Sequence, residues 1–330
     1  MASGRFAPSP TGALHLGNLR TALLAWLFAR STAGRFLVRM EDLDRVQASA
    51  EHEASQLRDL AALGLDWDGE VVRQSERFDR YEAAIAHLER AGLTYPCYCT
   101  RREIREAASA PHEGDVPDGS YPGTCRHLSS GERAERAQAG RAPALRLRAQ
   151  VAELTVDDDL LGPVTAGVDD VVLRRNDGVP AYNLAVVVDD AAQQVEQVVR
   201  GDDLASSAPR QRHLADLLGL PAVRYAHVPM VLAASGRRLA KRDGAATLAD
   251  QGALGRPPQV VRALLAASLG LAGPGEAVTP EVLLDRFDPS RLPLAAWVLG
   301  PEVLGPSAAA EAPGSGQERP SDPPLPGSRS

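Results

Sequence analysis

The amino-terminal part of the chain alternates between strand-like and helix-like apolar patterns. Residues 4–8 and 35–40 form short apolar runs that are typical of strands. Between these runs, apolar residues recur at the three- and four-residue spacing of a helix with one buried face, and Gly34 follows them. The helix-spaced residues are Leu16, Leu19, Leu23, Leu24, Leu27 and Phe28. The pattern predicts a strand, helix, strand unit of the kind that builds parallel α/β sheets.

Regular patterns continue along the chain on both sides of an irregular segment. Amphipathic helices are predicted at 47–63 and 75–91, with Gly64 and Gly92 as their stops. The pattern loosens over 96–150 into cysteines, prolines and charges, which indicates an insertion with its own fold. Beyond it we expect strands at 171–175, 185–188 and 195–199 and helices at 207–219 and 259–270.

These patterns predict a parallel α/β domain of Rossmann type that is split by the insertion and completed by a small helical carboxy-terminal part. We divide the chain into 1–95, the first half of the catalytic domain; 96–180, the insertion; 181–245, the second half; 246–304, the helical part; and 305–330, a tail. The tail is rich in Pro, Gly, Ser and Ala with almost nothing to bury, so we expect it to be disordered.

Composition and charge narrow the possible functions. The net charge of −7 does not attract nucleic acid over the whole surface, so any RNA contact must be local. No apolar run reaches the roughly 18 residues of a membrane span, and the start of the chain does not resemble a signal peptide. We therefore expect a cytoplasmic protein that binds no membrane. Every basic residue is arginine except Lys241, which indicates a position that needs a compact, flexible cation.

A turn-rich segment between the first strand and helix is the first candidate site. It reads Arg-Phe-Ala-Pro-Ser-Pro-Thr-Gly-Ala-Leu-His-Leu-Gly-Asn over residues 5–18. The amino end of a helix presents backbone N–H groups that have no partner within the helix, together with the positive end of the helix dipole. Both attract a phosphate. His15 can donate a further hydrogen bond there, and Gly17, which has no Cβ, lets a flat base lie against the backbone.

Three cysteines form a candidate metal site. Cys97, Cys99 and Cys125 are an odd-numbered cluster in one region, which suits a metal better than a set of disulfides. Three thiolates leave one ligand of a tetrahedral zinc site open. On chemistry alone His127 competes with Tyr121, because histidine is the commoner ligand.

The order of the motifs resembles class I aminoacyl-tRNA synthetases of the glutamyl and glutaminyl type. His15, Gly17 and Asn18 fall on the signature written HIGH, and residues 39–45, 177–190 and 200–204 match further family segments. The segment Arg-Leu-Ala-Lys-Arg at 238–242 is similar to the KMSKS loop, with arginine and alanine in place of its usual first lysine and first serine. The resemblance spans residues 4 to about 245.

The resemblance implies an ATP-dependent ligase that activates L-glutamate. His15, Gly17 and Lys241 would be catalytic, and His15, Gly17, Asn18, Arg238 and Lys241 would bind ATP, with Mg2+ expected beside it. The glutamate pocket would be formed by Arg5, Ser9, Glu41, Tyr182 and Arg200. A buried substrate carboxylate needs cations beside it, and the ammonium group of the substrate needs an acidic partner. Zn2+ would be held by Cys97, Cys99, Cys125 and, as the family pattern implies, Tyr121.

Length refines the resemblance. Only 89 residues follow Lys241, too few for the tail and a helical anticodon-binding domain as well. The chain therefore resembles the short glutamyl-queuosine tRNA(Asp) synthetases, which activate glutamate without tRNA and transfer it to queuosine at the wobble position of tRNA(Asp). Two alternatives stay open: a truncated glutamyl-tRNA synthetase that charges a tRNA 3′ end, and a non-catalytic regulator that binds adenylate or RNA. We expect a monomer and assign no single arginine to RNA.

Overall fold

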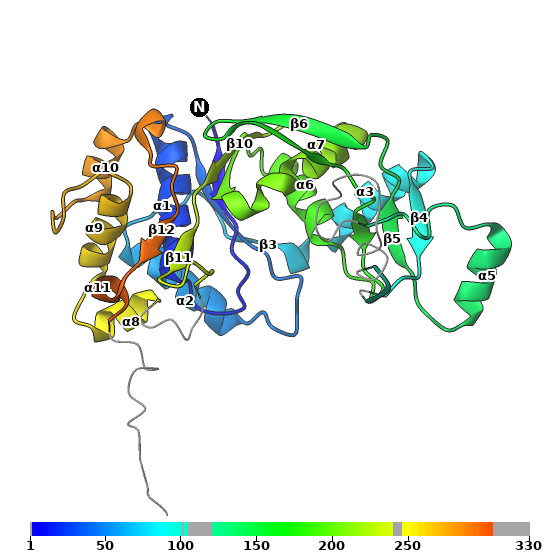
Figure 1. The fold of residues 1–330 in the computed structure, drawn as a ribbon, viewed down its shortest axis with the longest axis horizontal. Helices are drawn as coiled ribbons and strands as arrows, with labels where there is room; N and C mark the ends of the chain where they lie inside the picture. The colour runs from blue at the N-terminus through cyan, green and yellow to red at the C-terminus, as the bar shows by residue number, and fades with distance from the viewer. Residues whose placement is uncertain (1, 101, 105–120, 240–245, 306–330) are drawn as a thin grey trace, which may run out of the picture.

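The computed structural model describes residues 2–100, 102–104, 121–239 and 246–305. Within these residues the largest sheet has seven strands in the order β3-β2-β1-β9-β10-β6-β7 (Figure 1). Neighbouring strands run parallel from β3 to β6, and β7 returns antiparallel to β6. The predicted parallel α/β fold is confirmed. The strands are β1 (Gly4–Phe6), β2 (Phe36–Met40), β3 (Val72–Arg73), β6 (Glu153–Asp158), β7 (Gly162–Gly167), β9 (Gln197–Gly201) and β10 (Arg224–Val228).

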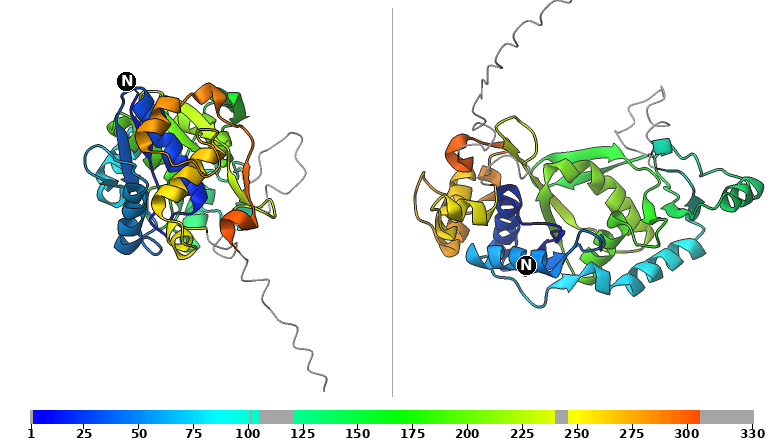
Figure 2. Two further views of the ribbon diagram at one scale, coloured as in Figure 1. Left: turned by 90° about the vertical axis from the view of Figure 1, so that its left-hand side faces the viewer. Right: turned by 90° about the horizontal axis from the view of Figure 1, so that it is seen from below.

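Helices cover both faces of this sheet (Figure 2). On one face, α1 (Leu16–Ser31) packs against β1, β2 and β9. Twelve of its residues are buried, and ten of these belong to a core shared with α2 (Ala50–Ala62) and the carboxy-terminal helices. On the other, α7 (Ala208–Leu217) contacts β6 and β7 and packs on α6 (Tyr182–Ala192), which in turn contacts α3 (Phe78–Arg90). Short 3-10 helices lie at Gln74–Glu76 (η1), Asp202–Ser207 (η2) and Pro289–Arg291 (η4).

Side-chain alternation along the strands brings charged groups to one face. Phe6, Val38 and Val199 belong to the core on the α1 side. The alternate residues Arg5, Arg39 and Arg200 therefore point to the α6 and α7 side, near the carboxyl ends of their strands. The carboxyl ends of parallel strands at a change in strand order are the usual ligand site of such sheets.

A second sheet forms the far end of the molecule. It is antiparallel, in the order β4 (Thr94–Cys97), β5 (Ala144–Leu147), β8 (Val172–Arg174), and α5 (Ser130–Gln138) lies beyond it (Figure 1). The hairpin of β6 and β7 falls within the segment 96–180 but extends the central sheet. The chain between the two halves of the parallel sheet thus contributes to both sheets.

The carboxy-terminal part packs beside α1 at the opposite end. It contains α8 (Leu248–Ala253), α9 (Pro258–Ser268), α10 (Pro280–Arg286) and α11 (Pro301–Leu304), with β12 (Trp297–Leu299) paired to β11 (Val231–Ala233). Arg20 of α1 is buried and donates to the Ser268 hydroxyl at 3.0 Å and to the Pro229 carbonyl at 3.0 Å. Among the described residues, no helix is both long and apolar enough to cross a bilayer.

One predicted element is wrong. The run 185–188 was expected as a strand, but it lies inside α6. The helix is buried on nearly all sides, so its apolar residues show no helical period, and a short apolar run does not separate a strand from a buried helix. The predicted stops Gly64 and Gly92 both have positive φ, 77° and 70°, as a helix-ending glycine requires. Lys241 and the tail from 306 onward lie outside the described residues.

Candidate functional site

A cavity of about 510 Å³ lies at the amino end of α1, beside the carboxyl ends of β1 and β9. Its walls bring together six of the predicted site residues: Ser9, His15, Gly17, Asn18, Arg200 and Arg238. Met230 also lines it. Residues that are 200 positions apart in the sequence therefore meet at one hollow, as a shared ligand would require.

His15 begins α1 as its N-cap. Its Nδ1 accepts a hydrogen bond from the Asn18 backbone N–H at 3.2 Å, and the Asn18 Oδ1 accepts one from the His15 N–H at 3.1 Å. Burial lowers the pKa of His15, which favours the neutral ring. Because Nδ1 accepts, the proton of the neutral ring sits on Nε2, which is the donor left for a ligand.

Gly17 lies where the surrounding atoms leave no space for a Cβ. A Cβ at this position would lie 2.9 Å from His15 Cε1 and 3.3 Å from the Val231 Cβ. Real Cβ atoms do not approach other atoms to 2.9 Å, so a side chain here would displace the His15 ring. The glycine therefore preserves the position of the histidine as well as an open backbone surface.

The segment that resembles KMSKS has one described flank in the wall of this cavity and the other against the start of α1. Arg238 and Leu239 line the cavity, and Arg238 pairs with Asp203 at 2.8 Å. On the other side of residues 240–245, the Ala246 carbonyl accepts a hydrogen bond from the Leu16 N–H at 2.7 Å, and His15 forms a β-bridge with Thr247. The two flanks of residues 240–245 thus lie at this cavity and at the first turn of α1, while Lys241 itself is not described.

A second cavity, of about 970 Å³, adjoins the first. Ser9 belongs to both walls, and Glu41 and Tyr182 line the second one. Burial raises the pKa of Glu41, although the charges of Arg39 and Arg5 oppose this shift. A ligand ammonium group beside Glu41 would add a third favourable charge.

Arg5 is buried and fixed from behind. Its Nε donates to Asp190 Oδ1 at 3.1 Å, and Arg39 reaches the same carboxylate oxygen at 2.8 Å. Burial alone would raise the pKa of Asp190, but Arg5 and Arg39 hold it below its ordinary value. Among the described residues Arg5 is not part of either cavity wall, so the structure gives it a place behind the pocket, within reach of Glu41 by charge.

Arg200 is also buried but faces the first cavity. Its Nη1 donates to Gln211 Oε1 at 2.7 Å and its Nε to His227 Nε2 at 3.0 Å. Its charge and that of Arg5 oppose the rise that burial causes in the pKa of Tyr182. The guanidinium therefore lines the first cavity and acts by its charge on Tyr182 in the second.

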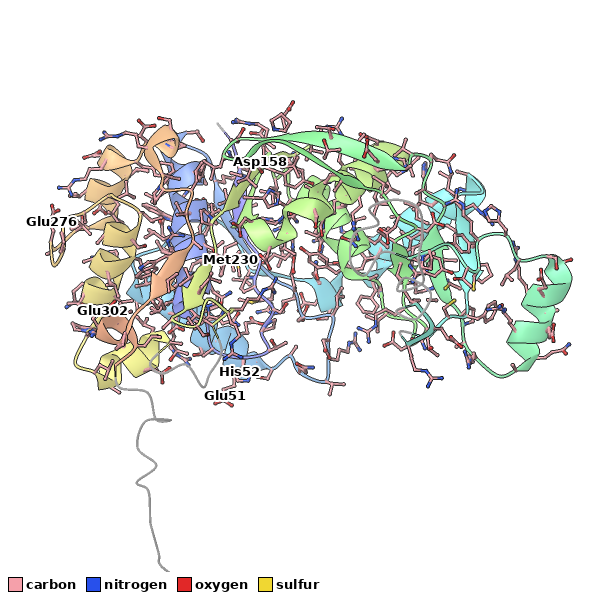
Figure 3. All side chains as sticks on the ribbon, viewed as in Figure 1. Glu51, His52, Asp158, Met230, Glu276 and Glu302 are labelled. Carbon is pink, nitrogen blue, oxygen red and sulfur yellow. The ribbon has the colours of Figure 1, made fainter. Side chains whose placement is uncertain are left out.

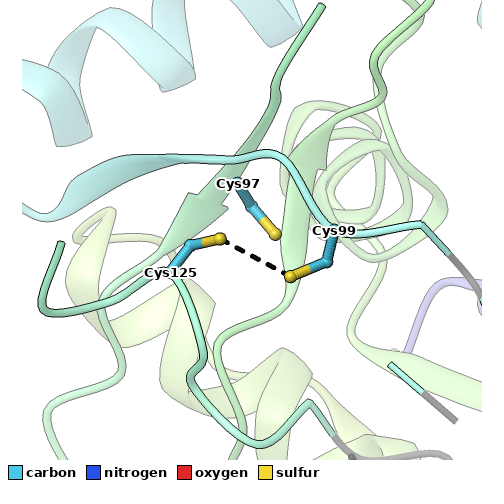
Figure 4. A group of neighbouring side chains, drawn as sticks. All are labelled: Cys97, Cys99 and Cys125. Atoms are coloured by element: carbon cyan, nitrogen blue, oxygen red, sulfur yellow. Dashed lines mark hydrogen bonds between the residues drawn. The ribbon is translucent and has the colours of Figure 1, made fainter. Parts of the chain in front are cut away.

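The three cysteines meet at the start of the second sheet (Figure 4). Their sulfur atoms lie within 4.8 Å of one another, and those of Cys99 and Cys125 are 3.5 Å apart. Tetrahedral zinc with Zn–S bonds of about 2.3 Å separates its sulfurs by about 3.8 Å, so the cluster fits one zinc ion. Burial, and then the charge of Cys97, raise the pKa of Cys99 to about 12, so the thiolate form needs a cation beside it.

The two candidates for the fourth ligand differ in position. The Tyr121 hydroxyl donates to Cys97 Sγ at 3.3 Å and lies 3.8 Å from Cys99 Sγ. His127 is exposed and is not part of the cluster. The geometry favours the tyrosine, whose ring also carries the Arg146 guanidinium 3.6 Å from its centroid.

Several residues that shape the site were not singled out from the sequence. The sequence marks Arg39, Asp190 and Gln211 only as members of family motif segments, and it does not mark Gln56 or His227. Gln56 is buried on α2 and donates to the carbonyls of Ser9 and Gly12 at 3.0 and 2.8 Å, which holds the loop around the first cavity. Apolar spacing gives no signal for such polar partners.

Comparison with known proteins agrees with this arrangement. Residues 2–303 match the family described as tRNA synthetases class I (E and Q), catalytic domain. The chain is 63% identical over 297 residues to a glutamyl-Q tRNA(Asp) synthetase of Nocardia farcinica, covering 90% of this chain and 93% of that one. It is 55% identical to one of Cutibacterium acnes, covering 88% and 86%.

A solved structure shares the fold. The crystal structure of a glutamate tRNA ligase from Elizabethkingia meningosepticum, in complex with its amino acid, matches with a TM-score of 0.76 and 25% identity over 92% of this chain and 68% of that one. Taken with the site described above, these findings show that the chain belongs to the class I tRNA synthetases of the glutamyl and glutaminyl type, in the group of glutamyl-Q tRNA(Asp) synthetases.

Proposed function

We propose that this protein activates L-glutamate with ATP in the absence of tRNA and then transfers the glutamate to the queuosine base at the wobble position of tRNA(Asp). The observation that carries the proposal is the pair of adjoining cavities that share Ser9. One is lined by the helix start and the KMSKS-like loop, and the other by Glu41 and Tyr182. The names of the relatives that are 63% and 55% identical supply the acceptor.

In the first step the α-carboxylate of glutamate attacks the α-phosphorus of ATP. The bond from that phosphorus to the oxygen that bridges to the β-phosphate breaks, and pyrophosphate leaves with Mg2+ as its expected counter-ion. His15 Nε2–H, the N–H groups at the start of α1 and Arg238 would stabilise the phosphate oxygens. Lys241 would add a flexible cation as charge builds on the leaving group.

The substrate pocket follows from charge pairing. Glu41 would pair with the ammonium group of glutamate, and Ser9 and Tyr182 would contact the substrate from either side. Arg200, with Arg5 behind the pocket, would compensate the buried side-chain carboxylate, which is what excludes glutamine. In the second step the queuosine hydroxyl oxygen attacks the carbonyl carbon of the mixed anhydride, and AMP leaves.

Labelling separates the proposal from its alternatives. Incubation with radiolabelled glutamate, ATP and tRNA(Asp) should label only tRNA that carries queuosine. Label on unmodified tRNA, at a 3′ end that periodate treatment would destroy, would instead show a shortened glutamyl-tRNA synthetase. A protein without glutamate-dependent exchange of pyrophosphate into ATP, with or without tRNA, would be a non-catalytic binder.

We further propose that Cys97, Cys99, Cys125 and Tyr121 hold one structural Zn2+. The purified protein should contain about one zinc per chain, and Tyr121→Phe should lose metal to a mild chelator faster than the matched variant His127→Ala. Faster loss from His127→Ala would assign the fourth ligand to the histidine. Because the acceptor is a tRNA, we propose that the protein acts in the cytoplasm. We also propose that it acts as a monomer.

A further inference from the structure

Arg200 is held by a series of buried polar side chains that are linked by hydrogen bonds. The first of them lies on a strand that is distant from Arg200 in the sequence. His227 of β10 stands beside Arg200 of β9 in the parallel register. Asp158, which is labelled in Figure 3, ends β6, the next strand. Asp158 Oδ2 lies 2.6 Å from His227 Nδ1, and the Arg200 Nε–H donates to His227 Nε2 at 3.0 Å. The side chains of Asp158 and His227 are 0% exposed, so water does not replace any of these bonds.

The chemistry of the three groups dictates where the imidazole proton lies. An arginine Nε always carries hydrogen, so His227 Nε2 must accept and cannot be protonated. The proton therefore sits on Nδ1 and is donated to the Asp158 carboxylate. Burial would raise the pKa of Asp158, but hydrogen bonds from His227 and from the backbone of Leu161 and Leu160 keep it low, which leaves the carboxylate ionised.

The same contacts leave part of the guanidinium available. An arginine has five N–H groups, and within the described part of the chain Arg200 uses three: Nε to His227, one Nη1 to Gln211 and one Nη2 to the Leu204 carbonyl at 3.3 Å. One N–H remains on each terminal nitrogen. Such a pair can donate two hydrogen bonds to one carboxylate, and Arg200 lines the first cavity, which shares Ser9 with the cavity of Glu41 and Tyr182.

We propose that Asp158 and His227 are positioning residues for glutamate recognition: Asp158 fixes the Nδ1–H tautomer of His227, which in turn fixes the guanidinium plane of Arg200 that receives a substrate carboxylate. The assignment of Arg200 to the substrate rests on the proposed function. The tautomer does not, because it follows from the contacts alone.

Asparagine at position 158 is a sharp probe of this chain. Asp158 Oδ1 accepts from the backbone N–H groups of Leu160 and Leu161 at 3.0 and 2.9 Å, and the His227 N–H is shared between Oδ1 at 3.2 Å and Oδ2 at 3.1 Å. An amide NH2 cannot face the two donors that only Oδ1 accepts, so the asparagine oxygen must take that place, with the shared His227 N–H also directed to it, and the NH2 must face His227 Nδ1. The ring then moves its proton to Nε2, where it meets the Arg200 Nε–H donor to donor. The variant therefore changes one tautomer while keeping the shape of the side chain.

The test compares Asp158→Asn with Asp159→Asn. Asp159 is the next residue in the same turn and pairs with Gln197 and Arg224 rather than with His227. In glutamate-dependent pyrophosphate exchange, Asp158→Asn should raise the KM for glutamate roughly 10- to 100-fold, the loss of a hydrogen bond to a charged group, and leave the KM for ATP within about 3-fold. Asp159→Asn should change neither.

Nitrogen-15 NMR of labelled histidine gives a readout that needs no activity. The His227 resonances, assigned by their loss in His227→Gln, should show the Nδ1–H tautomer in the wild type and the Nε2–H tautomer in Asp158→Asn. An Nε2–H tautomer in the wild type, or an unchanged KM for glutamate in a variant whose tautomer has switched, overturns the proposal. A wild type that binds no glutamate but has the Nδ1–H tautomer would instead count against the proposed function.

Two further variants cover the case in which Asp158→Asn does not fold. Glutamine at 227 keeps an oxygen acceptor near the former Nε2, whereas leucine removes it. The KM for glutamate should then be about 10-fold lower in His227→Gln than in His227→Leu. Equal values in two folded variants would show that His227 only fills space.

Discussion

The two cavities that meet at Ser9 are built in different ways. The larger one is backed by side-chain charges that partner one another: Asp190 binds both Arg5 and Arg39, and each of these lies on a strand. The smaller one is lined by the backbone at the start of α1, by a loop with an arginine, Arg238, that is 70% exposed, and by one buried charge, Arg200. We infer that the proposed glutamate side relies on charge pairs buried in the fold, whereas the proposed nucleotide side relies mainly on backbone groups and on side chains at the surface.

The difference predicts that substitutions on the two sides fail in different ways. On the charged side, removal of one partner leaves others buried without compensation, so stability and recognition fall together. On the nucleotide side, a substitution can misplace a group without weakening the core, so activity falls alone. The following predictions test this contrast.

The largest effect on stability is expected for Asp190→Asn. Loss of this carboxylate leaves Arg5 and Arg39 sharing a neutral partner in a dry site, which should lower the free energy of unfolding by about 3–5 kcal/mol. Urea denaturation measures it. Asp66→Asn is the matched control: its carboxylate is 72% exposed beside Arg30, and its loss should cost under about 1 kcal/mol. Equal costs would show that burial of the charged group does not matter.

Gly17→Ala should act on activity with little effect on stability. The added Cβ displaces the His15 ring, and a misplacement of about 1 Å can cost roughly 100-fold in rate. Pyrophosphate exchange should fall by about that factor while the melting temperature stays near the wild-type value. Gly252→Ala, in α8 with nothing within 4 Å of its added Cβ, controls for the change itself. A parallel loss of stability in Gly17→Ala would contradict the contrast.

Arg238→Ala should give a smaller effect of the same kind. The exposed pair with Asp203 contributes under about 1 kcal/mol to folding, so the stability should not change measurably. We expect kcat/KM for ATP to fall about 10-fold, because one cation near the phosphates is lost. The neighbouring Arg237, whose Nε donates to the Ser235 hydroxyl at 3.3 Å, supplies the control: Arg237→Ala should retain the wild-type value.

The smallest expected effect depends on pH. Burial raises the pKa of Asp59 on α2 to about 6, against the opposing charge of Arg58. The folded state then binds a proton more tightly than the unfolded one, so ionised Asp59 destabilises the fold above pH 6, and this cost disappears as pH falls from about 6 toward 4. Asp59→Asn should stabilise the protein by roughly 1 kcal/mol at pH 8 and by nothing near pH 4. Unfolding curves across this range test the sign; a gain that persists at pH 4 would exclude ionisation as its cause.

The sequence was sufficient for the parts of the fold whose periodicity is visible. The first strand, helix, strand unit came from alternating and helix-spaced residues, and α1 runs from Leu16 to Ser31 as its apolar face required. The hairpin of β6 and β7 was missed, because polar residues such as Asp157 and Asp158 interrupt any apolar run there. Strand order depends on pairing between distant segments, which local spacing does not encode.

The candidate site shows the same division. His15, Gly17, Asn18 and Arg238 were named from motifs, and the structure brings them to one cavity. Asp158 and His227 are 69 positions apart, and their contact exists only because β6 and β10 become neighbours. Partners that hold a motif residue in place therefore become visible only when the sheet is assembled.

The Leu16 backbone N–H donates a hydrogen bond to the Ala246 carbonyl, and through it the carboxy-terminal part supports the first cavity without lining it. This bond joins the first turn of α1 to the segment that begins the last quarter of the chain. A variant that ends before residue 246 would lose this hydrogen bond. We therefore expect it to be a poorer enzyme, even if its parallel sheet still folds.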